Sequence, residues 1–414
     1  MGAEDMDAAL ARTLLSPKAV RERAHRLLHL GVAGELPHFE VDPGKLCRCA
    51  DYVTATIRRN YPTLQVPLHA RWRHFAAGGF DRWGTLARDA AWPSSAAKGR
   101  AAFDLAIVSV LLDAGAGSRW RYREDASGES FSRSEGLAVA SFDMFSAGLF
   151  SARPNEPLRA DAARLAALEP AGVARAFQVG PENPMTGLDG RLSLLARLGE
   201  VVAAAPEVFG RHDDPRPGGL FDHLCAQAEG GVLPAEAILR AILDHLGPIW
   251  PGRITLGGVN LGDTWRHPSL VTHDATSGLV PFHKLSQWLA YSLIEPLQDA
   301  GIGVSGMDAL TGLAEYRNGG LFIDTGVLAL RDPALAGTAH PVDAPVIVEW
   351  RALTVALLDD TAALVRSSLG LTAEQFPLAK ALEGGAWAAG RRIARERRPD
   401  GSPPLQVVSD GTVF

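Results

Sequence analysis

Apolar residues recur at three- and four-residue spacing over most of the chain, within segments rich in alanine, leucine and arginine. This spacing gathers apolar side chains on one face of an α-helix and so predicts a mainly helical fold. The clearest helical segments are Met6 to Leu30, Phe103 to Leu112, Leu188 to Ala204 and Pro234 to Leu246. Strand signals are short and stand at Arg253 to Leu256, Leu321 to Leu328 and Leu405 to Val408. A large sheet is therefore not expected.

The length of the chain, 414 residues, exceeds the size at which one hydrophobic core usually stops growing. We therefore expect two closely packed helical lobes, residues 1–215 and residues 216–414, with most of the active site in the second. The boundary follows from the loop-forming composition of Arg211 to Gly219, which is rich in Pro, Gly and Asp.

The charge pattern argues against a nucleic-acid partner. The formal net charge is -6, whereas a nucleic-acid surface needs a basic stripe on a basic domain. The dense basic run near the C-terminus predicts a solvated helix face, and it contains Arg391, Arg392, Arg395, Arg397 and Arg398.

Cysteine usage and hydropathy indicate a cytoplasmic protein. The chain has 3 cysteines, an odd and sparse number that fits a reducing compartment. Its first residues lack the charged and apolar regions of a secretory signal, and no apolar run reaches the ~18 residues that cross a bilayer. We expect no membrane partner, and the sequence leaves the number of subunits open.

Polar, aromatic and glycine residues interrupt the helical pattern after Leu246, and the stretch from Gly247 to Asp359 carries most of the candidate site. Trp250 and Asp263 belong to its first strings, GPIWPGR and LGDTWRHP. Glycine lets the backbone approach a ligand and tryptophan supplies a flat wall, which favours a binding site. The alternative is a tight turn with Trp250 in the core.

The next string, VPFHKLSQWLAYSL, predicts a helix that starts at Pro281. His283 and Gln287 are one helical turn apart, so an imidazole and an amide could contact one ligand together. Lys284 lies beside them, although a solvated helix face would account for this lysine equally well.

Four polar side chains follow one another in the string AEYRNGGLFIDTG, whose short predicted strand ends at Asp324. Burying such a succession is costly unless a ligand satisfies it, so Glu315, Arg317 and Asp324 are candidate site residues. The alternative is an exposed turn with a weak ion pair between Glu315 and Arg317.

Glu349 and Arg351 stand inside the otherwise apolar string VIVEWRALTVALL. Charged side chains in such a run are rarely buried unless they are paired, so the string is typical of a pocket lining. The alternative for Glu349 is a favourable position near the start of a helix.

Two further motifs lie in the N-terminal half. Arg71, Arg73 and His74 share the string HARWRHF, and Asp113 ends an apolar helical run. The helix dipole disfavours an anion at that end, so Asp113 needs a partner or a function. The Gly-Ala-Gly that follows is too short for a phosphate loop and no dinucleotide fingerprint occurs, so we expect no cofactor.

Two clusters of histidine and aspartate raise the question of a metal. They are His267, His273, Asp274 and His283, and His212 with Asp213 and Asp214. Neither cluster has the spacing of a zinc signature, so we expect no catalytic metal.

Several long strings carry a family resemblance: SVLLDAGAGSRWRY, LGPIWPGR, LVPFHKLSQWLAYSLIEPL, LTGLAEYRNGGLFID, VEWRALTVALLD, EGGAWAAGR and SDGTVF. They are similar to the uracil catabolism protein 4 family of bacteria and fungi, from about His38 to Phe414. That family is associated with a uracil-degrading route in which the ring is opened and a ribosylurea species appears. The string VEWRALTV and the helical layout also resemble the queuosine-salvage nucleoside glycosidases, which have a DNA-glycosylase-like helical fold.

The two resemblances together imply hydrolysis of the N-glycosidic bond of ribosylurea or its 5-phosphate, which gives urea and ribose or ribose phosphate. Such a cleavage passes through an oxocarbenium-like sugar and needs a carboxylate near the anomeric carbon and an activated water. The candidate catalytic carboxylates are Glu315, Asp324 and Glu349. The candidate substrate-binding residues are His283, Lys284, Gln287, Arg317, Arg351, Asp113, Arg71, Arg73, His74, Trp250 and Asp263. The acidic residue that the queuosine enzymes have on the middle helix is absent, because Ser286 and Gln287 stand there.

Two other functions remain open at this point. One is a metal-assisted ureido or amide hydrolase of the same pathway, and the other is a non-catalytic binding protein of that pathway. In each case we expect a small-molecule partner, ribosylurea or a related nucleoside or nucleotide fragment, bound between the two lobes.

Overall fold

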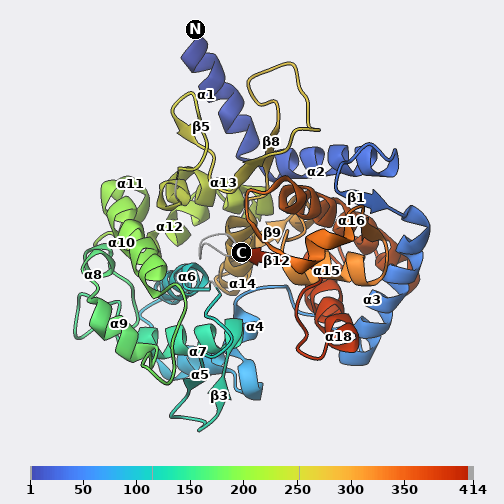
Figure 1. The fold of residues 1–414 in the computed structure, drawn as a ribbon. Helices are drawn as coiled ribbons and strands as arrows, with labels where there is room; N and C mark the ends of the chain where they lie inside the picture. The colour runs from blue at the N-terminus through green and yellow to red at the C-terminus, as the bar shows by residue number, and fades with distance from the viewer. Residues whose placement is uncertain (1, 114, 251, 409–414) are drawn as a thin grey trace.

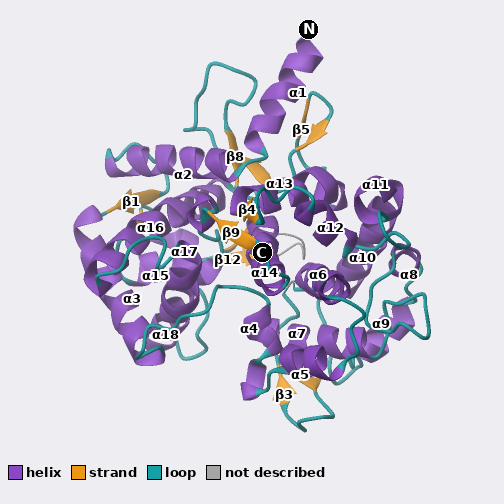
Figure 2. Ribbon diagram, turned by 180° about the vertical axis from the view of Figure 1, so that it is seen from behind, coloured by secondary structure: helices purple, strands orange, loops and turns teal. Residues whose placement is uncertain are grey.

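The structure is a computed structural model that describes residues 2–113, 115–250 and 252–408. The ending SDGTVF, and Ala114 and Pro251 within two of the strings quoted above, lie outside the described residues. Helices dominate the described residues (Figures 1 and 2), which confirms the prediction of a mainly helical fold.

The helices follow one another along the whole chain. Helices α1 to α9 are Ala3–Leu14, Pro17–Val32, Leu46–Asn60, Trp72–Phe75, Arg82–Asp89, Ser95–Leu111, Arg133–Ser146, Ala162–Ala166 and Pro170–Ala176. Helices α10 to α18 are Leu188–Ala204, Pro206–Phe209, Gly219–Cys225, Ala235–Leu246, Lys284–Asp299, Tyr316–Asp324, Pro345–Leu369, Leu378–Lys380 and Trp387–Arg397.

The strands are short. Strands β1 to β6 are Phe39–Val41, Tyr122–Arg123, Ser130–Phe131, Val232–Pro234, Thr255–Leu256 and Val259–Asn260. Strands β7 to β12 are Thr264–Arg266, Leu279–Pro281, Gly303–Ser305, Leu328–Leu330, Ala339–Pro341 and Gln406–Val408. They pair only in twos among the described residues: β1 with β10, β2 with β3, β4 with β9, β5 with β6, β7 with β8 and β11 with β12. As expected, no large sheet forms in this part of the chain.

The predicted helix boundaries succeed where local signals decide them. Helix α10 spans Leu188–Ala204 as predicted, whereas the segment predicted as one helix from Met6 to Leu30 is two, α1 and α2. The break is at Ser16, whose Oγ accepts a hydrogen bond from the Ala19 N–H at 3.2 Å, with Pro17 in the first turn. A capping serine followed by proline starts a new helix.

The strand predicted at Leu321 to Leu328 is wrong for most of its length. Residues 321–324 instead form the end of helix α15, residues 325–327 form a turn, and only Leu328 belongs to a strand, β10. Glu315 starts the helix because its side chain accepts hydrogen bonds from two backbone N–H groups of the first turn. The two glycines that suggested a turn are packing positions, since Gly319 lies against Trp350.

The two ends of the chain pack against each other. Helices α2 and α3, blue in Figure 1, lie beside helices α16 and α18, which are brown and red in the same view. Helix α14 is buried along most of its length and packs against α6 and α13. Packing therefore crosses the boundary predicted near residue 215, and the division into two lobes stays a prediction.

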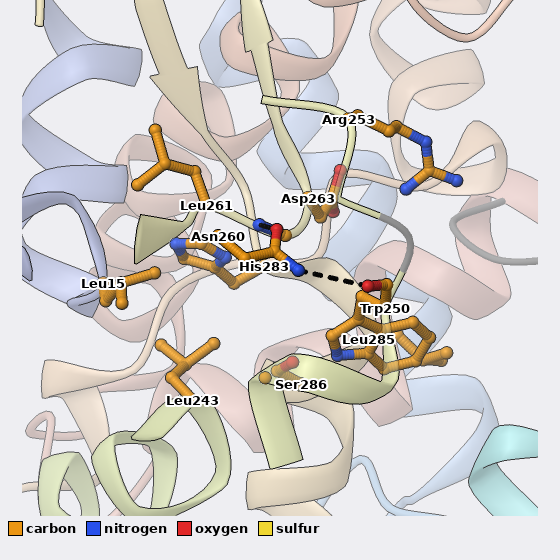
Figure 3. A pocket seen from close by; sticks show the side chains of 12 residues that line it. Leu15, Leu243, Trp250, Arg253, Asn260, Leu261, Asp263, His283, Leu285 and Ser286 are labelled. Carbon is orange, nitrogen blue, oxygen red and sulfur yellow. Dashed lines mark hydrogen bonds between the residues drawn. The ribbon is translucent and has the colours of Figure 1, made fainter. Parts of the chain in front are cut away.

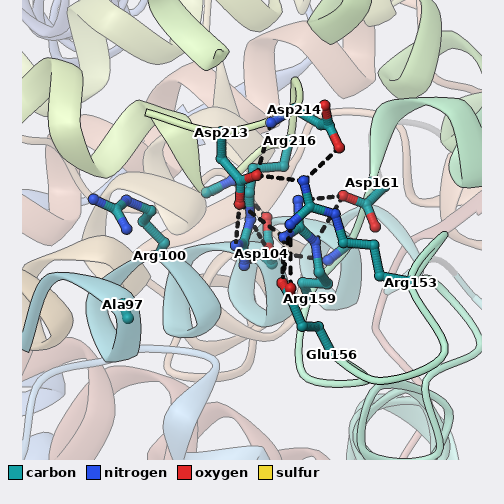
Figure 4. Close-up of polar contacts among 12 residues, drawn as sticks. Ala97, Arg100, Asp104, Arg153, Glu156, Arg159, Asp161, Asp213, Asp214 and Arg216 are labelled. Carbon is teal, nitrogen blue, oxygen red and sulfur yellow. Dashed lines mark hydrogen bonds and ion pairs between the residues drawn. The ribbon is translucent and has the colours of Figure 1, made fainter. Parts of the chain in front are cut away.

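A polar network holds the segment predicted as the boundary (Figure 4). Asp104 of α6 is fully buried and accepts hydrogen bonds from the Arg216 guanidinium and from the backbone N–H groups of Ala160 and Gly218. Arg159 is also buried and reaches Asp213 at 2.7 Å. Ion pairs thus join residues 151–161 and 213–216 to α6.

Within the described residues, no helix combines the length and the hydropathy that a bilayer crossing requires.

Candidate active site

A cavity of about 500 Å3, named here the main cavity, lies where helices α7, α14 and α15 begin. Its volume is in the range of small-molecule sites. Its lining comes from segments that are distant in sequence: His69, His74, Asp113, Gly115 to Ser118, Arg133, Ser134, Lys284, Trp288, Leu313, Glu315 to Arg317, Trp387, Asp400 to Pro403, Leu405 and Val407.

Four aromatic side chains form one wall of the main cavity. The His74 ring lies 5.6 Å from the Trp288 ring and 6.0 Å from the Trp387 ring, between centroids. The His69 ring lies 6.4 Å and 5.9 Å from the same two indoles. The Nδ1 of His69 is also 2.6 Å from a carboxylate oxygen of Glu383, which fixes its orientation. This aromatic wall can hold the flat, apolar face of a ligand.

The aromatic wall also carries polar atoms without a partner. His74 and Trp288 are buried, and neither His74 Nδ1 nor Trp288 Nε1 has a hydrogen-bond partner among the described residues. Burial and the nearby charge of Arg71 lower the pKa of His74 to about 4, so its imidazole is neutral. Leaving a buried donor or acceptor unsatisfied costs about 1–3 kcal/mol.

Asp113 reaches the main cavity from the end of α6 and has the partner that its position demands. The Nη1 of Arg71 lies 3.2 Å from Asp113 Oδ1. Arg71 is itself completely buried, and its guanidinium also donates to Ser109 Oγ at 2.8 Å and to the Ser134 carbonyl at 3.2 Å. Arg71 therefore does not line the main cavity but positions the carboxylate that does.

Glu315 brings a second carboxylate into the main cavity. One of its oxygens accepts from the Arg317 N–H at 2.9 Å and the other from the Asn318 N–H at 2.6 Å. These hydrogen bonds make Glu315 the N-cap of α15, and they hold the carboxylate in one orientation.

Lys284, the first residue of α14, lines the main cavity together with Asp113 and Glu315. Burial lowers the pKa of its ammonium group, while the negative charges of Glu315 and Asp113 act in the opposite direction. Its Nζ has no ion pair or hydrogen bond within the described residues. The ammonium group of Lys284 can therefore act on a ligand directly.

Other predicted binding residues are absent from the main cavity lining and line a second pocket instead, among them Trp250, Asp263 and His283 (Figure 3). Asp263 holds Arg351 through two contacts of 2.8 Å and accepts from the Lys284 N–H at 2.9 Å. Although burial favours the neutral acid, the charge of Arg351 holds the pKa of Asp263 at about 2. Trp250 and His283 line a cavity of about 20 Å3 beside them.

His283 and Gln287 do not present jointly to a ligand. His283 takes a left-handed backbone conformation at φ 47°, and its Nε2 lies 2.9 Å from the Leu14 carbonyl oxygen. Gln287 pairs with Thr311, whose backbone N–H donates to Gln287 Oε1 at 2.8 Å. The His283 contact ties the start of α14 to the end of α1, and the Gln287 contact ties α14 to the segment that leads into Glu315. Both are therefore positioning residues.

Three predicted residues lie elsewhere. Glu349 is completely buried, and it accepts from the Phe39 N–H at 2.8 Å and lies 3.1 Å from His267 Nε2. Asp324 pairs with Arg398 at 2.8 and 2.6 Å, in a smaller pocket. Arg73 pairs with Glu295 in a separate surface hollow. The structure therefore brings His74, Asp113, Lys284, Glu315 and Arg317 together in the main cavity, and it places Glu349 and Asp324 outside it.

Sequence reasoning missed several residues of the main cavity. His69 and Trp387 belong to quoted strings, HARWRHF and EGGAWAAGR, yet nothing in the spacing singles them out. Arg133 and Trp288 also gave no local signal. Within the described residues, no three His, Cys, Asp or Glu side chains gather as they would around a metal ion.

The fold and the site define a mainly helical protein with an aromatic and charged cavity at converging helix N-termini. A family model described as "Protein of unknown function (DUF1688)" matches residues 13–414, and the chain belongs to this family. Protein urg3 of Schizosaccharomyces pombe is 39% identical over 410 residues, which cover 97% of this chain and 98% of that protein. Uracil catabolism protein 4 of Lachancea kluyveri is 38% identical over 418 residues, with 92% and 93% covered. The predicted family resemblance is thus confirmed.

Proposed function

We propose that this protein acts in uracil catabolism as an N-glycoside hydrolase, which cleaves ribosylurea or its 5-phosphate to urea and ribose or ribose phosphate. The name of the relative from Lachancea kluyveri supports the pathway. The observation that carries the reaction is the meeting of Asp113, Glu315 and Lys284 in one cavity beside an aromatic wall. Two carboxylates and a proton donor are the groups that this cleavage requires.

Each of the three groups has a distinct task in the proposed reaction. Glu315, fixed by two backbone N–H groups, stabilises the positive charge that develops on the sugar. Lys284 donates a proton to the departing urea nitrogen, and burial moves its pKa toward the working range of a general acid. Asp113 accepts a proton from the water that attacks the anomeric carbon. The C–N bond breaks, a C–O bond forms, and the proton returns from Asp113 to Lys284 through solvent.

The first test is product analysis with the purified protein. Ribosylurea or its 5-phosphate should yield free reducing sugar and urea in equal amounts. Release of ammonia or carbon dioxide without free sugar would overturn the proposal in favour of a ureido or amide hydrolase.

The second test replaces each carboxylate by its amide. Glu315→Gln and Asp113→Asn should each lower kcat by at least ~10²-fold while circular dichroism shows an unchanged helical fold. Glu295→Gln is the matched control, because Glu295 also pairs with an arginine of the HARWRHF string but lies outside the main cavity. Retained activity in both cavity variants would contradict the assigned roles.

A further inference from the structure

The main cavity adjoins a smaller pocket with several arginines in its lining, named here the arginine pocket. Both spaces share Arg133, Tyr316, Arg317, Gly401 and Pro403. The arginine pocket is further lined by Arg391, Arg395 and Arg398, with Asp324 opposite. The sequence predicted a solvated helix face for this basic run. Three of its arginines instead line a pocket that adjoins the main cavity.

The ion pairs of the arginine pocket leave part of this charge uncompensated. Arg391 pairs with Glu135 at 2.7 Å, and Arg398 pairs with Asp324 at 2.6 Å. The other three guanidinium groups have no carboxylate within ion-pair distance in the part of the chain that the structure describes; they belong to Arg133, Arg317 and Arg395.

Arg317 is the most informative of the three, because its side chain is buried with only 8% of the residue exposed. Its guanidinium carbon lies 4.8 Å from the centre of the Trp387 ring and 5.4 Å from that of Tyr316. Ring faces recover only about 0.5–2 kcal/mol for a cation. Although burial acts to lower it, the pKa of Arg317 is raised by Tyr316 and by the negative charges of Glu315 and Glu135. Neither carboxylate lies within ion-pair distance, so an anionic ligand group at the junction of the two linings would be a closer partner for this buried cation.

Arg133 adds a second unusual feature at the same junction. It takes the left-handed backbone conformation at φ 56°, which costs a non-glycine residue of the order of 1–3 kcal/mol. It is also the first residue of the 14-residue helix α7, whose N-cap, Ser132, makes no side-chain capping bond. The start of this helix therefore presents a positive dipole end beside Arg133, and the next residue, Ser134, lines the main cavity.

The aromatic wall meets the arginine pocket at Trp387, whose ring centre lies 4.8 Å from the guanidinium carbons of both Arg317 and Arg391. The other members of the wall, His69, His74 and Trp288, line the main cavity and not the arginine pocket. Asp400 also lines the main cavity, but it is exposed, so solvent screens its charge. A ligand with a neutral, hydrogen-bonding part and an anionic end fits this arrangement.

We propose that the arginine end of the main cavity binds a phosphate group, so that the substrate is the phosphomonoester of ribosylurea rather than ribosylurea itself. This inference rests on the proposed function. Guanidinium groups bind phosphate oxygens through paired hydrogen bonds, and a phosphomonoester carries nearly two negative charges at neutral pH. The arginine pocket, at about 20 Å3, has room for roughly one water. The phosphate therefore lies at the junction, within the main cavity, and its oxygens face Arg133, Arg317 and Arg395.

Binding to the full chain tests the phosphate site independently of turnover. Titration calorimetry compares ribose 5-phosphate, ribose and inorganic phosphate. We expect ribose 5-phosphate to bind at least ~10-fold more tightly than ribose, and Arg133→Gln and Arg395→Gln each to remove most of that difference. Both arginines are exposed, so these variants should keep the fold. Equal affinity for ribose and ribose 5-phosphate would overturn the inference, and so would a ribose 5-phosphate affinity that neither variant changes.

Turnover supplies a second measurement, the ratio of kcat/KM for phosphorylated ribosylurea to that for ribosylurea. We expect a ratio of at least ~10² for the protein and a fall of at least ~10-fold in each of the two variants. Arg392→Gln is the matched control, because Arg392 lies on α18 as Arg395 does. Its side chain pairs with Glu396 and stacks on Tyr52, outside both pockets. Its ratio should not change.

The outcomes separate the two proposals. If ribosylurea is cleaved as fast as its phosphomonoester and the variants keep that ratio, the phosphate site is wrong and the glycoside hydrolase stands. If neither compound yields free sugar but ribose 5-phosphate binding depends on Arg133 and Arg395, the reaction is wrong and the phosphate site stands.

Discussion

Asp113 and Glu315 reach the same cavity under different constraints. Glu315 is fixed on both oxygens by backbone N–H groups at the start of a helix, whereas Asp113 is held from one side by the buried guanidinium of Arg71. A carboxylate with two fixed hydrogen bonds suits charge stabilisation, and the less constrained one suits proton transfer from water. Lys284 completes the set because its ammonium group has no competing partner within the described residues.

The pH dependence of turnover follows from the state of Lys284. A general acid works only while protonated, so activity should fall as the pH rises through the pKa of Lys284. Burial lowers that pKa, and the midpoint of the alkaline limb should therefore lie below the ordinary lysine value of about 10.4. A profile of kcat against pH measures this midpoint.

Variants identify the group that titrates. Lys284→Gln should lower kcat by about 10²–10⁴-fold and abolish the alkaline limb, while Lys98→Gln, a change on α6 outside the main cavity, should leave both as they are. A wild-type limb that persists in Lys284→Gln would assign the titration to another group.

At the scale of the elements, the site depends on how closely α15 and α16 approach each other. A Cβ at Gly319 would lie 2.7 Å from the Trp350 ring and 2.8 Å from Thr354 Oγ1, so this glycine sets the distance between the two helices. Glu315 is the N-cap of helix α15, and Arg317 lies in the first turn of that helix. A displacement of α15 would therefore move both side chains in the main cavity.

The change Gly319→Ala should therefore destabilise the protein. Overpacking costs about 1–3 kcal/mol, which exceeds the roughly 1 kcal/mol that alanine contributes inside a helix. Urea unfolding should show a lower free energy of unfolding. The matched control is Gly190→Ala in α10, where no atom lies within 4 Å of the added Cβ, and this variant should be as stable as the wild type or more stable. An unchanged midpoint for Gly319→Ala would contradict the close approach.

The sequence predicts elements well where neighbouring residues decide them. Helix α10 matched its prediction, and Asp113 stood out because an anion after an apolar helix needs a partner. Glu349 and Arg351 stood out equally, but their partners are Phe39, His267 and Asp263, more than 80 residues away. No local pattern distinguishes a charge satisfied by such distant contacts from one that faces a cavity. His69 and Trp387 were missed for the same reason, because only the fold brings them together.

For the molecule as a whole, the buried carboxylate of Asp104 is the anchor of the polar network in Figure 4. It holds Arg216 and two backbone N–H groups from segments that are more than 50 residues away in sequence. The network lies at the segment where the sequence predicts a lobe boundary, and it links residues from both sides of that boundary.

Removing this anchor should be costly. Asp104→Ala removes the carboxylate that pairs with the buried guanidinium of Arg216. We expect the free energy of unfolding to fall by about 3–5 kcal/mol. Asp244→Ala removes an exposed carboxylate of the pair with Arg240 and should change it by less than about 1 kcal/mol. Comparable urea midpoints for the two variants would show that the network contributes no more than a surface pair.

The segment Asp400 to Val407 follows the last helix, α18, and forms part of the main cavity lining. This part of the lining therefore lies beyond every helix of the described residues. A chain that stopped at Arg397 would contain all of these helices and still lack one side of the main cavity lining. The helical framework and the complete lining are thus supplied by different parts of the chain.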